Sequence, residues 1–315
     1  MMELALSVLE GVAVLLLAPF FAGFIHKLKQ RIRGQKGISL FQYYRNFHKL
    51  FKKETVLSKD ATIISHIAPF MYLVPNILLI FTLPLFYAKP LITYSNPMLF
   101  AYLLSLSIFF MTLYALDQGS SFGGLGSSRE WFISSLSEPA FLLLLFSVCL
   151  YFKEWNISVA FLRLGEEVKS LTVGYGHFSI SIPFLLLISL FILTLAENAR
   201  IPFDNPETHL ELTMIHEANI LEASGTHLLL FEYASQLKLT IFMSLIVLLT
   251  MPYMAQTALY FIPAFLFYLL KMLILSSLIA FVESANAKMR LFRLPNLLSV
   301  AFVLSLVSLV LSMEV

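Results

Sequence analysis

Eight long apolar runs constrain what this chain can fold into more than any other feature of its sequence. Each is close to the length that a helix needs to cross the hydrocarbon core of a bilayer. Because only helices and closed barrels satisfy their backbone hydrogen bonds in lipid, such runs predict helices. We expect an all-α integral membrane protein, one polytopic membrane domain over residues 1–315. Its eight transmembrane helices would cover about Leu4–Phe24, Ile63–Tyr87, Met98–Leu116, Ile133–Phe152, Phe178–Ala196, Leu228–Thr250, Thr257–Val282 and Leu297–Ser312.

The composition supports this class of protein. Of the residues, 59% are hydrophobic and 13% are charged, which excludes an ordinary soluble domain. The net charge of +2 gives no reason to expect nucleic acid as a partner. The single cysteine, Cys149, excludes an internal disulfide, and it excludes an iron–sulfur cluster or zinc site built from this chain alone.

The basic residues predict how the helices are oriented. With eight spans, alternate connections share one side of the membrane, and 15 of the 21 Lys and Arg residues lie in the first, third, fifth and seventh connections. The opposite side carries only Lys89, Lys153, Arg163 and Lys169. The positive-inside rule then places both termini outside. It places four segments in the cytoplasm, at about 25–62, 117–132, 197–227 and 283–296.

The connection between the fifth and sixth spans is long and acidic. From Ala196 to Gly225 it carries six acidic residues and a single basic one, Arg200. A simple membrane anchor has no need of such a segment, so we interpret it as the working part of the chain. Clustered carboxylates near a membrane repel one another, which raises the pKa of some of them towards neutrality and suits them to proton transfer. Glu197 and Arg200, three residues apart, can pair.

The same connection carries a signal for a helix of its own. Thr208 and Glu211 have the spacing of a capping box, which predicts a helix from His209 to about Glu222. On that helix His209 and His216 would lie about 10 Å apart. That distance is too long for both to chelate one metal ion, so we expect no metal site.

The first and third connections carry different patterns. Apolar residues recur at three- and four-residue intervals from Ile38 to Phe51 with basic residues between them, which predicts an amphipathic helix at the membrane surface. This segment is either an orientation-setting charge cluster, a docking surface for a peripheral partner or the rim of a lateral opening. In the third connection the glycine- and serine-rich stretch Ser120–Ser128 predicts a loop rather than a helix.

Ionisable residues inside or at the ends of the spans are candidates for function, because burying them in a membrane is costly. Glu232, Lys238 and Lys271 lie within spans, and Arg129, Glu130 and Glu138 lie at the entrance to the fourth. Glu232 and Lys238 point to different faces of an ideal helix, so their partners should lie on other helices or in another subunit. Interhelical ion pairs and a proton relay both explain such residues.

Several runs resemble a known family. The run AENARIPFDNPETHLELTMIHEA resembles the cytoplasmic connection of the membrane subunit called H in bacterial respiratory complex I. The resemblance extends over most of the chain, through RIRGQKGISLFQYYRNFHKLFKKE, GSSREWFISSLSEPA, FEYASQLKLTIF and ESANAKMRLFRLPNLL. The sequence THLELTMIHE and the SRE…SEPA spacing resemble the counterpart in energy-converting membrane-bound NiFe hydrogenases, including formate hydrogenlyase-type complexes, more closely than the quinone-linked form. The quinone-linked form typically has an acid in place of His209.

The resemblance implies a function. The chain would be a non-catalytic subunit of an oxidoreductase complex in the inner (cytoplasmic) cell membrane, and it would couple electron transfer in a peripheral hydrogenase-like module to proton or sodium translocation. It would bind no cofactor, and the NiFe centre and 4Fe-4S clusters would belong to partners. Those partners would be hydrogenase-like large and small subunits, a ferredoxin-like iron–sulfur subunit and antiporter-like membrane subunits in the lipid bilayer.

The candidate residues fall into two sets. The coupling or proton-pathway set comprises Glu138, Glu197, Asp204, Glu207, Glu211, Glu217, Glu232, Lys238, Lys271 and Glu283. The partner-docking set comprises Arg31, Arg33, Arg129, Glu130, Arg200, His209 and His216. Two alternatives stay open: a quinone-site subunit of a complex I-type NADH or ferredoxin:quinone oxidoreductase, and a stand-alone ion transporter. No internal repeat favours the transporter.

Overall fold

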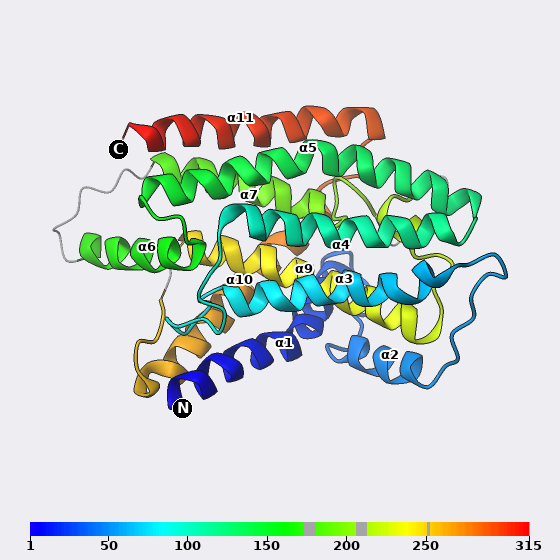
Figure 1. Cartoon of the computed structure of the whole chain (residues 1–315), viewed down its shortest axis with the longest axis horizontal. Helices are drawn as coiled ribbons and strands as arrows, with labels where there is room; N and C mark the ends of the chain where they lie inside the picture. Colours follow the sequence, from blue (N-terminus) through cyan, green and yellow to red (C-terminus); the bar gives the residue numbers. More distant parts are fainter. Residues whose placement is uncertain (173–180, 206–212, 251–252, 315) are drawn as a thin grey trace.

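The computed structural model describes residues 1–172, 181–205, 213–250 and 253–314, and these residues form a bundle of helices that run roughly side by side (Figure 1). In the described ranges, seven helices are long and apolar enough to cross a membrane. They are α1 (Met2–Ile32), α3 (Ile63–Thr82), α4 (Pro97–Asp117), α5 (Ser121–Tyr151), α9 (Gly225–Thr250), α10 (Phe261–Ala285) and α11 (Leu294–Met313). The predicted fifth span corresponds to α7 (Ser181–Glu197), which is apolar but shorter.

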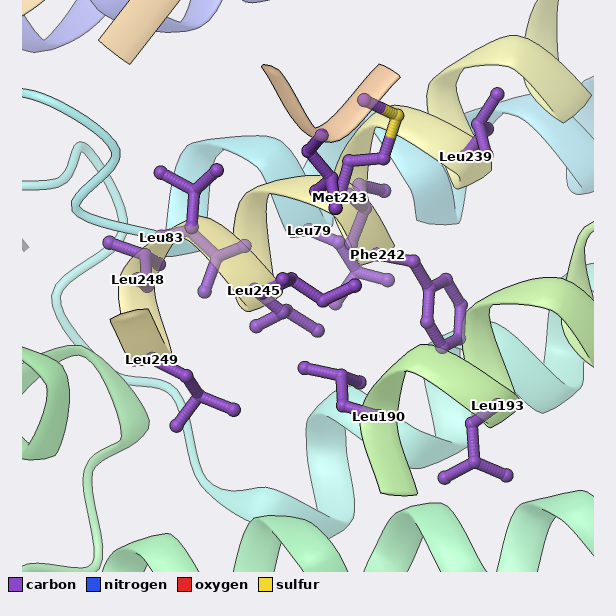
Figure 2. Close-up of a cluster of buried hydrophobic side chains, with 14 of the residues drawn as sticks. Leu79, Leu83, Leu190, Leu193, Leu239, Phe242, Met243, Leu245, Leu248 and Leu249 are labelled. Carbon is purple, nitrogen blue, oxygen red and sulfur yellow. The ribbon is translucent and has the colours of Figure 1, made fainter. Parts of the chain in front are cut away.

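Helix α9 lies at the centre of the bundle and is buried over more of its length than any other candidate span. A helix that is apolar all round must be enclosed by other helices. Figure 2 shows how this is achieved: Leu79 of α3 and Leu190 of α7 lie beside Phe242 and Leu245 of α9. The polar side chains that are buried on α9 therefore need partners inside the protein.

Short helices complete the described chain: α2 (Gln42–Phe51), α6 (Ile157–Thr172), α8 (His216–Asn219), η2 (Ala258–Tyr260) and η3 (Leu291–Arg293). Helix α2 confirms the amphipathic segment, although it begins later than predicted. Two of its aromatic side chains contact the bundle: Tyr44 donates to the Leu16 carbonyl at 2.5 Å, and the Phe47 ring lies 5.7 Å from that of Tyr233. Helix α6 was not predicted from the sequence.

The prediction of a loop at Ser120–Ser128 is wrong, because α5 already begins at Ser121. Ser120 caps the helix by accepting from the Gly123 N–H at 3.0 Å. The glycines allow close packing instead of a turn. A Cβ on Gly123 would lie 2.5 Å from the Ala115 carbonyl oxygen, and one on Gly126 would lie 2.7 Å from Cβ of Ala218.

The prediction of a continuous helix up to Glu222 is also wrong in its described part, where only the four residues of α8 are helical. The Asp204 carboxylate accepts the backbone N–H groups of Ile215 and His216, at 2.9 and 3.1 Å, so these groups are not used in a longer helix. The beginning of the predicted helix, including His209 and Glu211, lies outside the described residues.

Candidate coupling site

A buried ion pair joins three helices in the middle of the candidate site. Nζ of Lys238, on α9, lies 2.7 Å from Oε2 of Glu197, the last residue of α7. Lys238 is 1% exposed and Glu197 is 7% exposed. The Ser137 hydroxyl of α5 donates to the other carboxylate oxygen of Glu197. As its position on α9 indicated, Lys238 has its partner on another helix.

A second carboxyl group borders the same pair. Glu138, half-buried on α5, and Glu197 both line a cavity of about 10 Å³ whose walls are otherwise mainly apolar. This volume is near the lower limit for one water molecule. Two acids around a water-sized space beside one ammonium form an arrangement in which a proton can move over a short distance.

Asp204 joins two connections between helices of the bundle. Its Oδ1 accepts from Nζ of Lys288 at 2.6 Å, while its Oδ2 accepts the two backbone N–H groups described above. Lys288 also donates to the Thr213 carbonyl oxygen. Asp204 is almost fully buried. Its contacts attach the described acidic connection to the segment that follows α10.

Glu283, at the end of α10, is shared by two cations. Its oxygens lie 3.2 Å from Nη1 of Arg200 and 3.1 Å from Nζ of Lys29. The expected pairing of Arg200 with Glu197 is therefore wrong. The reason is local: α7 ends at Glu197, and Ala199 takes a φ of 49°. The spacing of a continuous helix no longer applies, so the two side chains point to different partners.

His216 lies at the start of α8, in the connection before α9. Its Nδ1 lies 3.5 Å from Oε1 of Glu130, a distance that fits an ion pair better than a strong hydrogen bond. Burial acts to lower the pKa of His216, but the nearby Glu130 and Glu217 carboxylates outweigh it and raise that pKa. Next to Glu130, Arg129 donates to the Met214 carbonyl oxygen at 2.8 Å.

Comparison with known proteins identifies the family. The family model described as NADH dehydrogenase matches residues 5–313. The chain belongs to this family. It is 31% identical to hydrogenase-4 component C of Escherichia coli (strain K12) over 245 residues, 78% of this chain and 74% of that relative. It is 25% identical to formate hydrogenlyase subunit 4 of the same organism over 307 residues, 94% of each chain.

The fold of this NADH dehydrogenase family member is also known from a solved structure. A chain of the membrane-bound sulfane sulfur reductase, an archaeal respiratory membrane complex, superimposes with a TM-score of 0.82, covering 99% of this chain and 100% of that one. At 17% identity this similarity shows the fold alone.

The structure brings together only part of the two candidate sets. Glu217 on α8 and Glu232 on α9 are half-buried, and Arg31 and Arg33 are exposed. Lys271 lies elsewhere, 4.7 Å from the centre of the Phe267 ring and in an apolar groove of about 420 Å³ between α7, α9 and α10. The residues that lie outside the described ranges are Glu207, His209 and Glu211.

Sequence reasoning missed three residues of this region and one outside it. Lys29 and Lys288 were counted only as charges that set the orientation, and Ser137 carried no signal at all. Glu10 was missed although an ionisable residue within a span is itself a signal. In the described parts of the chain no group of three or more His, Cys, Asp or Glu residues could hold a metal ion.

The His216–Glu130 pair predicts a pH dependence. Because the pKa of His216 is raised from its ordinary value of 6.5, the pair stabilises the folded chain fully below that pH and loses this effect as pH rises through the raised pKa. Glu130→Gln should therefore cost about 1.5–3 kcal/mol in acid and little in alkaline buffer. Thermal unfolding of purified wild type and variant across pH measures the difference. A difference that is constant with pH would contradict the assignment.

Proposed function

We propose that this chain anchors a peripheral electron-transfer module to the membrane and couples its redox reaction to ion translocation. The observation that carries the proposal is a series of buried ion pairs running from the cytoplasmic connections into the bundle. It starts at Asp204 and Lys288, includes Glu283 with its two cations, and ends at Glu197 and Lys238. A charge displaced at one end alters the balance of the next pair, which is the physical requirement for coupling.

The relatives support a hydrogenase-like partner. Two of them are components of hydrogenase-4 and of formate hydrogenlyase. By analogy, the partners of this chain are hydrogenase-like large and small subunits that hold the NiFe centre, a ferredoxin-like subunit with 4Fe-4S clusters, and antiporter-like membrane subunits. This chain supplies no redox centre of its own and acts as a non-catalytic subunit in the inner cell membrane.

The proposed orientation follows from the basic residues. Eight spans, α7 included, place both termini outside and the acidic connection in the cytoplasm. Single cysteines in place of Ser170 and Thr226 should then react with a membrane-impermeant reagent from opposite sides of sealed vesicles. Thr226 should be labelled from the cytoplasmic side. Labelling of both positions from one side would contradict the eight-span arrangement.

Docking of the peripheral module is tested by charge reversal in the acidic connection. We expect Glu207→Lys together with Glu211→Lys to release most of the peripheral module from washed membranes, because like charges would then meet across the interface. The matched control is Glu54→Lys with Asp60→Lys, two acidic residues of the first connection. Retention of the module with full redox activity in the first variant would refute a docking role for Glu207 and Glu211.

A further inference from the structure

Glu10 is a buried carboxyl group that the proposed coupling route does not use. It lies on α1 and is 2% exposed. One of its oxygens accepts the backbone N–H groups of Phe86 and Tyr87, at 2.7 and 2.8 Å. No ion pair joins it to a Lys, Arg or His within the described residues. A carboxyl group held in a membrane bundle without a cation is costly to keep ionised and is therefore readily protonated.

Glu10 lies in the outer half of the bundle, at a distance from the acidic connection along the length of the helices. It is eight residues from the start of α1, which corresponds to about 12 Å of helix. The same end of the bundle holds the start of α10 and the loop after α9, where Ala88 donates to the Ala255 carbonyl oxygen at 3.0 Å (Figure 1). The Lys29–Glu283 ion pair lies at the opposite end of α1 and α10.

A row of polar side chains on α9 leads towards Glu10. Glu232, Gln236, Thr240 and Ser244 follow one another at four-residue intervals and so lie along one side of the helix. The last three are buried. The Thr240 hydroxyl donates to the Gln236 carbonyl at 2.8 Å and the Ser244 hydroxyl to the Thr240 carbonyl at 2.7 Å, so proton transfer along the row requires these hydroxyl groups to rotate. Gln236 is only 7% exposed, and its side-chain amide oxygen is buried without a hydrogen-bond partner. Such an atom indicates a place for a transient water or proton donor, because an unsatisfied buried acceptor is otherwise unfavourable.

Tyr268 lies at the end of this row and packs against the loop that binds Glu10. Its hydroxyl lies 2.7 Å from that of Ser244, and either group can donate to the other. The rings of Phe86 and Tyr268 lie 5.6 Å apart, so the loop that holds the Glu10 carboxylate also packs on Tyr268.

We propose that Glu10 is a proton-binding site at the outer end of a polar row through this chain, which consists of Glu232, Gln236, Thr240, Ser244 and Tyr268. The inference rests on the proposed coupling function and extends it by naming an exit side. In the last step the Ser244 hydroxyl turns from the Thr240 carbonyl to the Tyr268 oxygen and donates its proton there. Tyr268 passes its own hydroxyl proton on towards the Glu10 carboxylate, and Ser244 takes a replacement proton from the row behind it. Both hydroxyl groups stay neutral overall, and Glu10 later releases the proton outwards.

A purely structural role for Glu10 is the competing explanation, since the carboxylate also fixes the loop at Phe86 and Tyr87. Glu10→Gln separates the two roles. The amide oxygen of glutamine still accepts the backbone N–H groups, but the side chain no longer carries an exchangeable acidic proton. If the role of Glu10 is structural, the variant should keep its proton movement. If Glu10 binds the transferred proton, the variant should lose it.

The experiment uses the whole complex in sealed vesicles and compares proton movement with redox turnover. In Glu10→Gln we expect normal abundance and redox turnover within about twofold of wild type, with most of the proton movement per electron lost. Tyr268→Phe, which keeps the ring that packs on Phe86, should give the same loss. The matched control is Ser276→Ala, which removes a buried hydroxyl that only donates to the Met272 carbonyl within α10 and should change nothing.

The outcomes separate the two proposals. An unchanged ratio in Glu10→Gln at normal abundance overturns the proton site. If that variant assembles poorly, Tyr268→Phe decides between the two explanations. A large fall in proton movement per electron in Tyr268→Phe supports the site, and an unchanged value overturns it. A wild-type complex that moves sodium alone overturns the site but leaves coupling intact. A wild-type complex that moves no ion refutes the proposed function itself, and with it the site.

Discussion

Replacing Lys238 by methionine is expected to destabilise the chain by about 3–5 kcal/mol, because it leaves the Glu197 carboxylate buried without a cation. Methionine fills a similar volume, so the loss comes from charge and not from a cavity. The remaining donor to Glu197, the Ser137 hydroxyl, is too weak a partner for a full charge. The measurement is the abundance and thermal stability of the purified complex.

The double variant Glu197→Gln with Lys238→Met separates stability from function. It removes both charges, so we expect most of the lost abundance to return. If the pair carries protons, gradient formation per electron should stay low although the complex is whole. Lys29→Met is the matched control. Its partner Glu283 still has Arg200 at 3.2 Å, so Lys29→Met should destabilise the chain less than Lys238→Met does. Equal losses from Lys238→Met and Lys29→Met would contradict this account.

The helices were largely predictable because the apolar runs and the amphipathic spacing are local properties of the sequence. The prediction of a loop at Ser120–Ser128 was wrong because it treated glycine as a helix breaker. In the structure Gly123 and Gly126 are required by close contacts with Ala115 and Ala218. Those contacts depend on where other segments pack, and no local pattern contains that information.

The ionisable residues of the site could be selected from the sequence, but their partners could not. Lys238 and Glu197 are 41 residues apart, and Asp204 and Lys288 are 84 apart. Local spacing favoured Arg200 as the partner of Glu197, and the end of α7 removed that possibility. A charge in an apolar span thus indicates that a partner exists, while only the packing of the bundle determines which residue it is.

Asp204→Asn should detach the described part of the acidic connection from the bundle, with a loss of about 3 kcal/mol or more, because several bonds to one buried charge are weakened together. Both oxygens of the native carboxylate accept hydrogen bonds: one from Lys288 and the other from the N–H groups of Ile215 and His216. In asparagine one of these oxygens becomes an NH2 group, so in either orientation a donor faces a donor.

Lys288→Met is the informative comparison, because it removes the ammonium but leaves Asp204 bonded to the two backbone N–H groups. We expect protease cleavage within 197–224 in inside-out vesicles to increase strongly in Asp204→Asn and less in Lys288→Met, with peripheral-module retention falling in the same order. The order matters more than either value. If Lys288→Met is as damaging as Asp204→Asn, the connection is held mainly by the ion pair. If Asp204→Asn has no effect, Asp204 does not hold it at all.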